Sequence, residues 1–312
     1  MASIAPDTKR RNYMRGNVTR AVGRTMGGMQ AISATEKRSG SVVGQMLREW
    51  RTARRVSQLD LALQAGFSAR HLSFIETGRT QPSRQALLIL AETLDLPLRE
   101  RNLLLEAGGY ARMYRQTPLG ADEMSHIRGL LHFILERHKP YAAIVLDRYA
   151  NCVMGNGASE RLVASLVDSS LLTSHANHLR IVFHPLGARR FIVNWEEVSH
   201  HLLGRAEREF GHTKDDEAAA LLTELRGYAG PVVSHRASER VSSGDLLLPI
   251  HIRRDDFELR IFSTIMTLGT PQDVTLQDLR IETFFPADTE SEAIWMRLIA
   301  PSDSDVAVAS HG

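Results

Sequence analysis

Residues 57–78 read SQLDLALQAGFSARHLSFIETG, and this stretch decides the fold of the first part of the chain. Its apolar residues recur at the i, i+3, i+4 spacing of two short amphipathic helices, each with one face that must be buried. Gly66 lies between the two runs and suits a turn at positive φ. The sequence therefore predicts two helices crossed over a tight turn, a helix-turn-helix. The inward residues are Leu61, Ala62 and Ala65 in the first helix and Leu72 and Ile75 in the second.

Polar side chains mark the ends and the outer face of this pair. Ser57 and Ser68 are placed to cap the two helices with their hydroxyl groups. The second helix of such a unit lies in the major groove of DNA and presents its first turns to base edges. Arg70 suits a bidentate pair with guanine, and Ala69 or Phe74 suits contact with a thymine methyl group. The predicted DNA-binding residues are Gln58, Ser68, Ala69, Arg70, Ser73, Phe74, Arg79 and Arg84, of which Gln58, Arg79 and Arg84 would hold the phosphate backbone.

The residues around this pair resemble a known family. The segment GQMLREWRTARRVSQLDLALQAGFSARHLSFIETGRTQPSRQALLILAETLDL, within residues 44–105, is similar to the Cro/phage-repressor (Xre-type) DNA-binding domain. The resemblance implies an all-α, five-helix, lambda-repressor-like domain in which Arg51 forms a structural ion pair with Glu76. The alternative is that residues 57–78 form only a helical hairpin in an all-α core.

The length of the chain and the positions of its predicted linkers suggest two domains. Its 312 residues suffice for two cores of ordinary size. We expect a disordered basic arm over 1–40, a DNA-binding domain over 41–110, a linker and bridging helix over 111–139, a ligand-binding and dimerisation domain over 140–300, and a disordered tail over 301–312. Within the first domain, helices are predicted from about residue 43 to 55, burying Val43, Leu47 and Trp50, and after Ser83 and Pro97.

Charge is distributed unevenly between the two parts. Residues 1–115 carry 19 Lys and Arg against 9 Asp and Glu, whereas the remaining residues carry 19 against 27. A basic N-terminal part and an acidic C-terminal part indicate that only the first faces a polyanion such as double-stranded DNA.

The second half alternates between helical and strand patterns. An amphipathic helix that ends before Pro140 would bridge the domains or pack in a dimer. YAAIVLD and NCVMGN predict a β-hairpin that is followed by a helix over 158–167, and HLRIVFHP reads as a third, strand-like run. Helices are predicted over 191–210 and 215–228, and strands in LLLPIHI, FELRIFSTIMTLG and LRIETFFP, the last two antiparallel. A mixed α+β domain results.

This half also resembles a known family, the ligand-binding domain of MmyB-like transcription regulators, whose fold is PAS-like. The segments that carry the resemblance are PYAAIVLDRYANCVMGN, LRIVFHPLG, FIVNWEEVSHHLL and FSTIMTLGTPQDVTLQDLRIETFFPAD. The resemblance implies an apolar cavity and a small hydrophobic ligand such as a fatty acid. Strand alternation and the helix stripe suggest lining residues, and an amphiphilic ligand would need a polar anchor; each apolar candidate could equally be ordinary core. The candidates are Ile144, Leu146, Val153, Trp195, Phe262, Ile265 and Phe284 for the lining, and Asn156, His184, Asn194 and Arg280 for the anchor.

Catalytic and metal-binding patterns are not found in the sequence. His175 and His178 are three residues apart, and His200 and His201 are adjacent, but no third ligand has a spacing typical of a metal site. Cys152 is the single cysteine, which excludes an intramolecular disulfide. We expect no enzyme activity, no cofactor, no membrane span and no secretion, and we expect a cytoplasmic location.

These features predict a homodimeric, sequence-specific transcription regulator whose C-terminal domain alters operator binding when a small molecule occupies it. Two alternatives remain open. In one, the C-terminal domain serves only for oligomerisation and DNA binding is constitutive. In the other, it is a haem or flavin sensor or an enzyme.

Overall fold

The computed structural model describes residues 32–168, 171, 176–210, 215–230, 247–254 and 256–299, with side chains described from residue 42 onward. The described residues divide into two compact units, one formed by the residues up to Leu94 with Ala107–Gly109 and the other by Asp95–Glu106 with the residues from Tyr110 onward. The predicted disorder of residues 1–31 and 301–312 falls outside the described residues.

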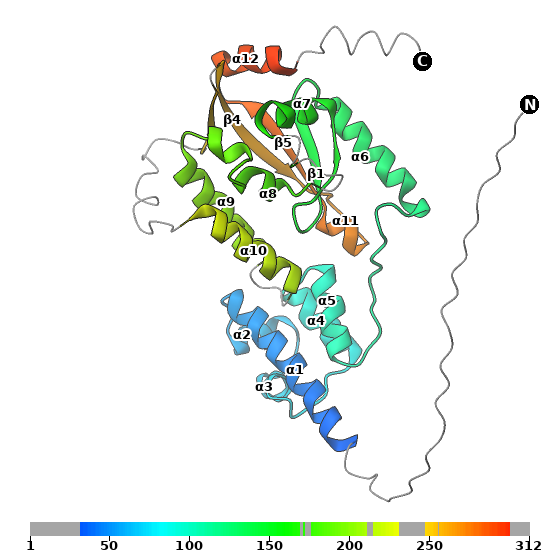
Figure 1. The fold of residues 1–312 in the computed structure, drawn as a ribbon. Helices are drawn as coiled ribbons and strands as arrows, with labels where there is room; N and C mark the ends of the chain where they lie inside the picture. Colours follow the sequence, from blue (N-terminus) through cyan, green and yellow to red (C-terminus); the bar gives the residue numbers. More distant parts are fainter. Residues whose placement is uncertain are drawn as a thin grey trace, which may run out of the picture. The chain divides into compact units, whose positions relative to one another are not determined.

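Within its described part, every secondary-structure element of the first unit is a helix (Figure 1). Serine hydroxyls cap three of its helices, as the sequence predicts: Ser57 Oγ accepts from the Asp60 N–H at 3.1 Å, Ser68 Oγ from His71 and Ser83 Oγ from Ala86. The elements are α1 (Ile32–Ala53), α2 (Gln58–Gln64), α3 (Ala69–Glu76) and α4 (Arg84–Thr93).

The first helix departs from the prediction at its start. α1 begins at Ile32, so the disorder predicted up to residue 40 is wrong for 32–40. Val43 and Leu47 are fully buried, but Trp50 is only half-buried and carries the Arg54 guanidinium 5.8 Å from its ring. An amphipathic stripe therefore predicted the face of the helix correctly but not its length.

Gly44 determines how closely α1 approaches α3. A Cβ atom at this position would lie 2.5 Å from the carbonyl oxygens of both Ile75 and Glu76. Those are backbone atoms at the C-terminal end of α3, which cannot move aside without shifting the helix. The contact therefore depends on glycine at position 44.

The fifth helix, α5 (Leu98–Ala107), is mostly part of the second unit. The Leu98 N–H donates to Gln277 Oε1 at 2.6 Å, and Arg99 forms an ion pair with Asp278 at 2.5 Å. The predicted boundary near residue 110 thus differs from the observed division, which falls between α4 and α5.

The first part of the predicted linker, residues 111–121, is held by side chains of its own unit. Asn102 Oδ1 accepts from the N–H groups of Met113 and Tyr114, both at 3.0 Å, and its Nδ2 donates to Tyr114 O. The Thr117 hydroxyl donates to Asp273 Oδ2 at 2.7 Å. These bonds order a segment that has no secondary structure of its own.

The second unit is built on an antiparallel sheet with strand order β2-β1-β5-β4-β3 (Figure 1). The predicted hairpin is confirmed as β1 and β2, and the predicted antiparallel pair as β4 and β5. The strands are β1 (Ala142–Leu146), β2 (Cys152–Gly155), β3 (Ile250–Arg254), β4 (Phe257–Met266) and β5 (Arg280–Pro286).

Helices cover both faces of this sheet. On one face, α6 (Ser125–Arg137) buries Leu131 and Leu135 against alternate residues of β1 and β5, among them Val145 and Ile281. The other face carries a larger apolar core that includes Ile144, Phe284 and, from α12 (Thr289–Ile299), the fully buried Trp295. The described residues therefore show α6 packed on the sheet of its own unit.

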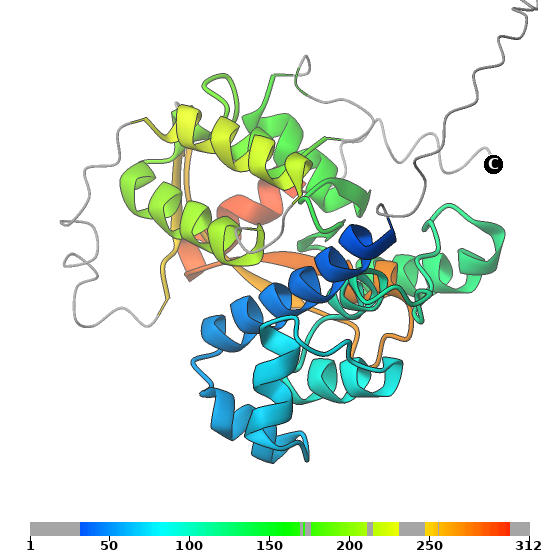
Figure 2. The same cartoon turned by 90° about the horizontal axis from the view of Figure 1, so that it is seen from below.

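The remaining helices form a second core on that other side. The pair α9 (Trp195–Phe210) and α10 (Asp216–Ala229) lie side by side in both views (Figure 2). They pack with α8 (His178–Phe183) and with the short 3-10 helix η3 (Ala188–Phe191) preceding α9. Among the described residues, three further helical elements belong to the second unit. They are α7 (Gly157–Leu166) after β2, the 3-10 helix η1 (Asp122–Met124) before α6, and α11 (Val274–Asp278) between β4 and β5.

Two predictions for this region are wrong. HLRIVFHP forms the helix α8 and not a strand, because Asn177 caps it by accepting from the Arg180 N–H at 3.1 Å and its apolar residues are buried among helices. The long helix begins at Trp195 instead of residue 191. Within the described ranges, no helix is both long and apolar enough to cross a membrane.

Candidate DNA interface and ligand cavity

The helix-turn-helix predicted from residues 57–78 is present as α2 and α3. Leu61, Ala62, Leu72 and Ile75 are fully buried, and Gly66 adopts the left-handed conformation with φ of +73° in the turn between the helices. Because the apolar faces are buried against each other, the polar face of α3 is turned outward.

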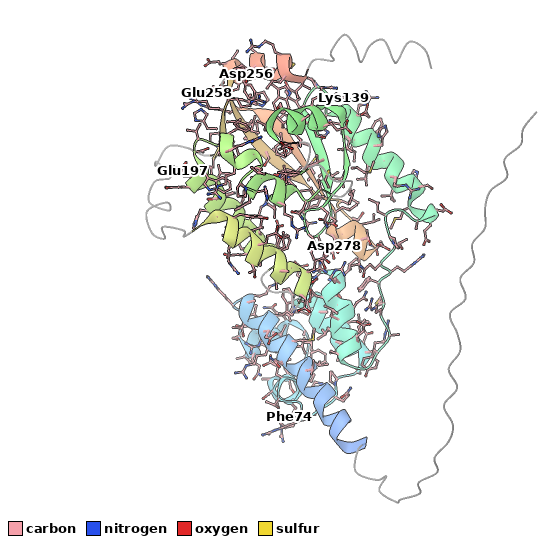
Figure 3. All side chains as sticks on the ribbon, viewed as in Figure 1. Phe74, Lys139, Glu197, Asp256, Glu258 and Asp278 are labelled. Atoms are coloured by element: carbon pink, nitrogen blue, oxygen red, sulfur yellow. The ribbon has the colours of Figure 1, made fainter. Side chains whose placement is uncertain are left out.

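The outward face of α3 gathers most of the predicted DNA-reading residues. Ala69 and Arg70 are exposed in its first turn, and Ser73 and Phe74 are half-buried in its second. The Arg70 guanidinium lies 5.3 Å from the centre of the Phe74 ring, and that of Arg79 lies 5.7 Å from it. Figure 3 shows Phe74 pointing away from the helices. Two cations therefore flank one aromatic ring on the face that would enter a groove.

The predicted ion pair between Arg51 and Glu76 is confirmed. Nε of Arg51 contacts Oε1 of Glu76 at 2.7 Å, and Nη2 contacts Oε2 at 3.1 Å, which is bidentate geometry. The hydrogen bonds that Arg51 donates to Glu76 raise the pKa of Arg51 against the effect of burial. The side chain of Glu76 is only 4% exposed, so the pair fixes the C-terminal end of α3 against α1.

Three other predicted contacts lie at the edges of this face. Gln58 is half-buried and its amide donates to Glu76 Oε2 at 2.9 Å, so in this structure it supports the ion pair. The Ser68 hydroxyl is used as the cap of α3. Arg84 is exposed as the first residue of α4.

The second unit contains an apolar cavity of about 90 Å³ between the sheet and its covering helices. Its walls come from β1, β3, β4 and β5 on one side and from α7, α8, η3 and α9 on the other. The lining residues are Ala142, Ile144, Ser159, Leu162, Val163, Leu166, Val167, His178, Ile181, Val182, Ala188, Ile192, Leu202, Ile250, Ile252, Ile261, Ser263, Glu282 and Phe284.

A buried carboxylate interrupts this apolar wall. Glu282 lies in the middle of β5 and is 2% exposed. Its Oε1 accepts from Ser263 Oγ at 2.8 Å, and Arg205 approaches its two oxygens at 3.5 and 3.3 Å. Nε2 of His178 is 3.9 Å from Oε2. Among the lining residues, Glu282, Ser263 and His178 therefore form a polar spot, and the hydroxyl of Ser159, which also lines the cavity, donates to the Asn156 carbonyl oxygen at 2.7 Å.

The protonation states of Glu282 and His178 follow from their burial and from the charged groups around them. Burial alone would raise the pKa of Glu282, but His178, Arg205 and the Ser263 hydroxyl outweigh that effect and lower it, so the carboxylate is ionised. Burial lowers the pKa of His178, and Arg205 adds to that effect against the attraction of Glu282. A neutral imidazole thus faces an ionised carboxylate at neutral pH.

Of the predicted ligand-binding residues, Ile144 and Phe284 line the cavity. Strand alternation explains the position of Phe262: Ile261 and Ser263 face the cavity, so Phe262 points to the opposite face, where its ring lies 5.6 Å from that of Phe285. Ile265 shares the cavity face but is 43% exposed beyond its edge.

The remaining candidates have other partners in the structure. Asn156 is buried and bonds the backbone of Ala143, Leu135 and Tyr141, while Asn194 bonds His251 and Pro249. Their positions are strand and helix ends, which explains why polar residues occur there. The other residues that the structure places away from the cavity lining are Leu146, Val153, His184, Trp195 and Arg280.

The polar residues of the cavity were missed by the sequence analysis. Glu282 carries a detectable signal, because a charged residue stands in the apolar strand run LRIETFFP. His178 and Ser263 carry none, since each becomes a neighbour of Glu282 only through folding. No cluster of three potential metal ligands occurs among the residues that the structure describes, and His175 falls outside them.

Comparisons with known proteins match both units. A family model described as a helix-turn-helix domain matches residues 42–104, and one described as the MmyB-like transcription regulator ligand binding domain matches residues 127–298. The crystal structure of the restriction-modification controller protein C.AhdI from Aeromonas hydrophila is similar at 35% identity, covering 21% of this chain and 96% of that chain, with a TM-score of 0.21. Comparison with curated proteins gave no match. Both family resemblances predicted from the sequence are thereby confirmed.

Proposed function

This chain belongs to the family of transcription regulators that carry an MmyB-like ligand-binding domain, and we propose that a small hydrophobic effector in its second unit modulates operator binding by its first. The observation that carries this proposal is the cavity, whose lining is mostly apolar and includes few polar residues, chiefly the cluster around Glu282. Ligand sites have this composition, with apolar walls for affinity and few polar groups for orientation. The family resemblance implies a fatty acid, and compounds extracted from the purified protein test that class against other small amphiphiles.

The first unit would read the operator through α3. Arg70 is proposed to contact a base edge, while Arg79 and Arg84 position the duplex by contacts to phosphates. We further propose a homodimer, because units of this kind bind paired half-sites about one helical turn apart.

Transmission of the effector signal is proposed to run through β5 and α11 to α5. Glu282 at the cavity is close in sequence to Gln277 and Asp278, and these two side chains hold Leu98 and Arg99 of α5. Most of α5 lies in the segment that matches the helix-turn-helix model, although it is held by the second unit. A ligand that prefers one position of β5 would therefore bias α5, and only such differential affinity can shift DNA binding.

We propose a regulatory role and not an enzymatic one. The Ser263 hydroxyl donates to Glu282 instead of to a histidine, and a carboxylate with a lowered pKa is a weak general base. This arrangement supports binding of a polar group more than activation of a nucleophile.

The test has two parts, both with the full-length chain. Operator sequences are first selected from random DNA, and binding is measured by fluorescence anisotropy with and without compounds extracted from the purified protein and identified by mass spectrometry. A change of at least threefold in operator Kd on adding the extracted compound supports the proposal. Tight operator binding that no extracted compound alters, from a protein whose native mass spectrum shows a dimer, would favour the constitutive, oligomerisation-only alternative.

A further inference from the structure

The position of Glu282 in the sheet directs its carboxylate to the cavity. The register pairs Glu282 with Ile144 on β1 and with Ile265 on β4, and direct partners in an antiparallel sheet share a face. A buried glutamate on this face requires compensation, since charged groups are almost never fully buried unless paired.

The compensation that the described residues provide is incomplete. An ionised carboxylate offers about four lone-pair sites. The Ser263 hydroxyl fills one at 2.8 Å, but the Arg205 contacts at 3.3 and 3.5 Å exceed the 2.7–2.9 Å typical of strong charge-assisted bonds. His178 Nε2, at 3.9 Å, is beyond hydrogen-bond distance. Oε2 can therefore accept a further hydrogen bond from inside the cavity.

The cavity wall offers nothing that would neutralise an anionic ligand. Of the described residues, those that line it include no lysine or arginine, and Arg205 lies outside the lining set and is already paired with Glu282. A ligand carboxylate at this spot would face a carboxylate of the same sign in apolar surroundings, where like charges repel strongly. The lowered pKa of His178 agrees with this, because a neutral imidazole supplies no positive charge at neutral pH.

We propose that the effector has an apolar body and a hydrogen-bond-donating end, such as a hydroxyl or an amine, which binds Glu282, and that a carboxylate at that end is disfavoured. This inference rests on the proposed sensor function and specifies the class of its ligand. At about 90 Å³ the cavity is smaller than the roughly 150 Å³ cavity that admits benzene, so short chains are the appropriate probes.

The test compares ligands that differ only at the polar end. Full-length protein is titrated by isothermal calorimetry with the primary alcohol, amine, methyl ether and carboxylate of two-, three- and four-carbon chains, which are no larger than benzene. The alcohol or amine is expected to bind at least tenfold more tightly than the carboxylate and the methyl ether of equal length. If the carboxylate binds most tightly, this inference is overturned while the sensor function stands. If no member of the series binds, this inference is overturned, while the sensor function is decided separately by the compounds extracted from the purified protein.

Substitution of the carboxylate provides the second arm. Glu282→Gln removes the charge at nearly constant side-chain volume. The ratio of the affinity for the alcohol to the affinity for the carboxylate should therefore fall at least tenfold. Glu258→Gln, at an exposed glutamate of β4, is the matched control and should leave the ratio unchanged (Figure 3). An unchanged ratio in a folded Glu282→Gln protein would refute the assignment. If that variant fails to fold, the ranking of ligands by the unsubstituted protein still decides the question.

Discussion

The N–H of Leu98 donates a 2.6 Å hydrogen bond to Oε1 of Gln277, and this bond joins the first turn of α5 to α11 across 179 residues of sequence. Beside it, Arg99 pairs with Asp278. Since β5 starts directly after α11, these two contacts connect the strand that carries Glu282 to a helix that lies mostly within the helix-turn-helix family match.

Gln277→Ala should weaken this connection. Loss of one hydrogen bond costs about 0.5–1.5 kcal/mol of stability, and operator affinity without effector should stay within about threefold. The change in operator affinity caused by the effector should shrink, because α11 then holds α5 through the Arg99–Asp278 pair without the Gln277 bond. Anisotropy titrations with and without effector measure both quantities. Gln272→Ala, at an exposed position before α11, is the control; an effector response that Gln277→Ala leaves intact would exclude this route.

Arg70→Ala and Arg84→Ala should affect DNA binding in different ways. Arg70 lies in the first turn of α3, so its loss should cost about 1–3 kcal/mol on the best operator and relax the choice of base at one position. Arg84 is the first residue of α4, and its loss should weaken all sequences alike and reduce the salt dependence of binding. Binding to an operator library resolves the two patterns. Identical patterns would show that the recognition helix has been placed incorrectly.

Gly44→Ala should destabilise the first unit although alanine is the better helix former. The added Cβ would lie 2.5 Å from two backbone oxygens of α3, and overpacking of this kind costs about 1–3 kcal/mol. Gly129→Ala is the matched control, because Gly129 is exposed on α6 with no atom within 4 Å of the added Cβ, and it should gain up to about 1 kcal/mol. Denaturant unfolding of both variants gives the comparison; equal shifts would contradict the close approach of α1 and α3.

Acidification should destabilise the second unit in two stages. Burial lowers the pKa of His178 below 6.5; the positive charge of Arg205 lowers it as well, and the negative charge of Glu282 opposes both effects. Below about pH 6.5 the unfolded chain therefore binds a proton that the folded chain does not, and stability falls by at most about 1.4 kcal/mol per pH unit. Glu282, whose pKa is lowered below 4.5, contributes stability above that pH and loses it as the pH falls through the folded value.

His178→Gln tests the first stage. Unfolding free energies measured between pH 5 and 7 should depend less on pH in this variant than in the unsubstituted protein. His126→Gln, at an exposed histidine of α6, should retain the original dependence. An identical slope in all three proteins would show that His178 is not the responsible group.

The sequence by itself determined the features that depend on local patterns. The sequence predicted the helix-turn-helix over residues 57–78 and its serine caps, because caps, turns and amphipathic stripes depend on residues a few positions apart. The ion pair of Arg51 with Glu76 was predicted from the resemblance to the Xre-type family. The β1–β2 hairpin and the antiparallel β4–β5 pair followed from alternation and turn signals.

Only the tertiary structure decided the features that depend on long-range packing. The same apolar run, HLRIVFHP, suits a strand or a helix, and burial among α9 and α10 made it α8. The polar spot of the cavity unites His178, Ser263 and Glu282, which are neighbours because strand register and helix packing bring distant segments together. No spacing in the sequence encodes that proximity, since it arises from the sum of many weak contacts over the whole unit.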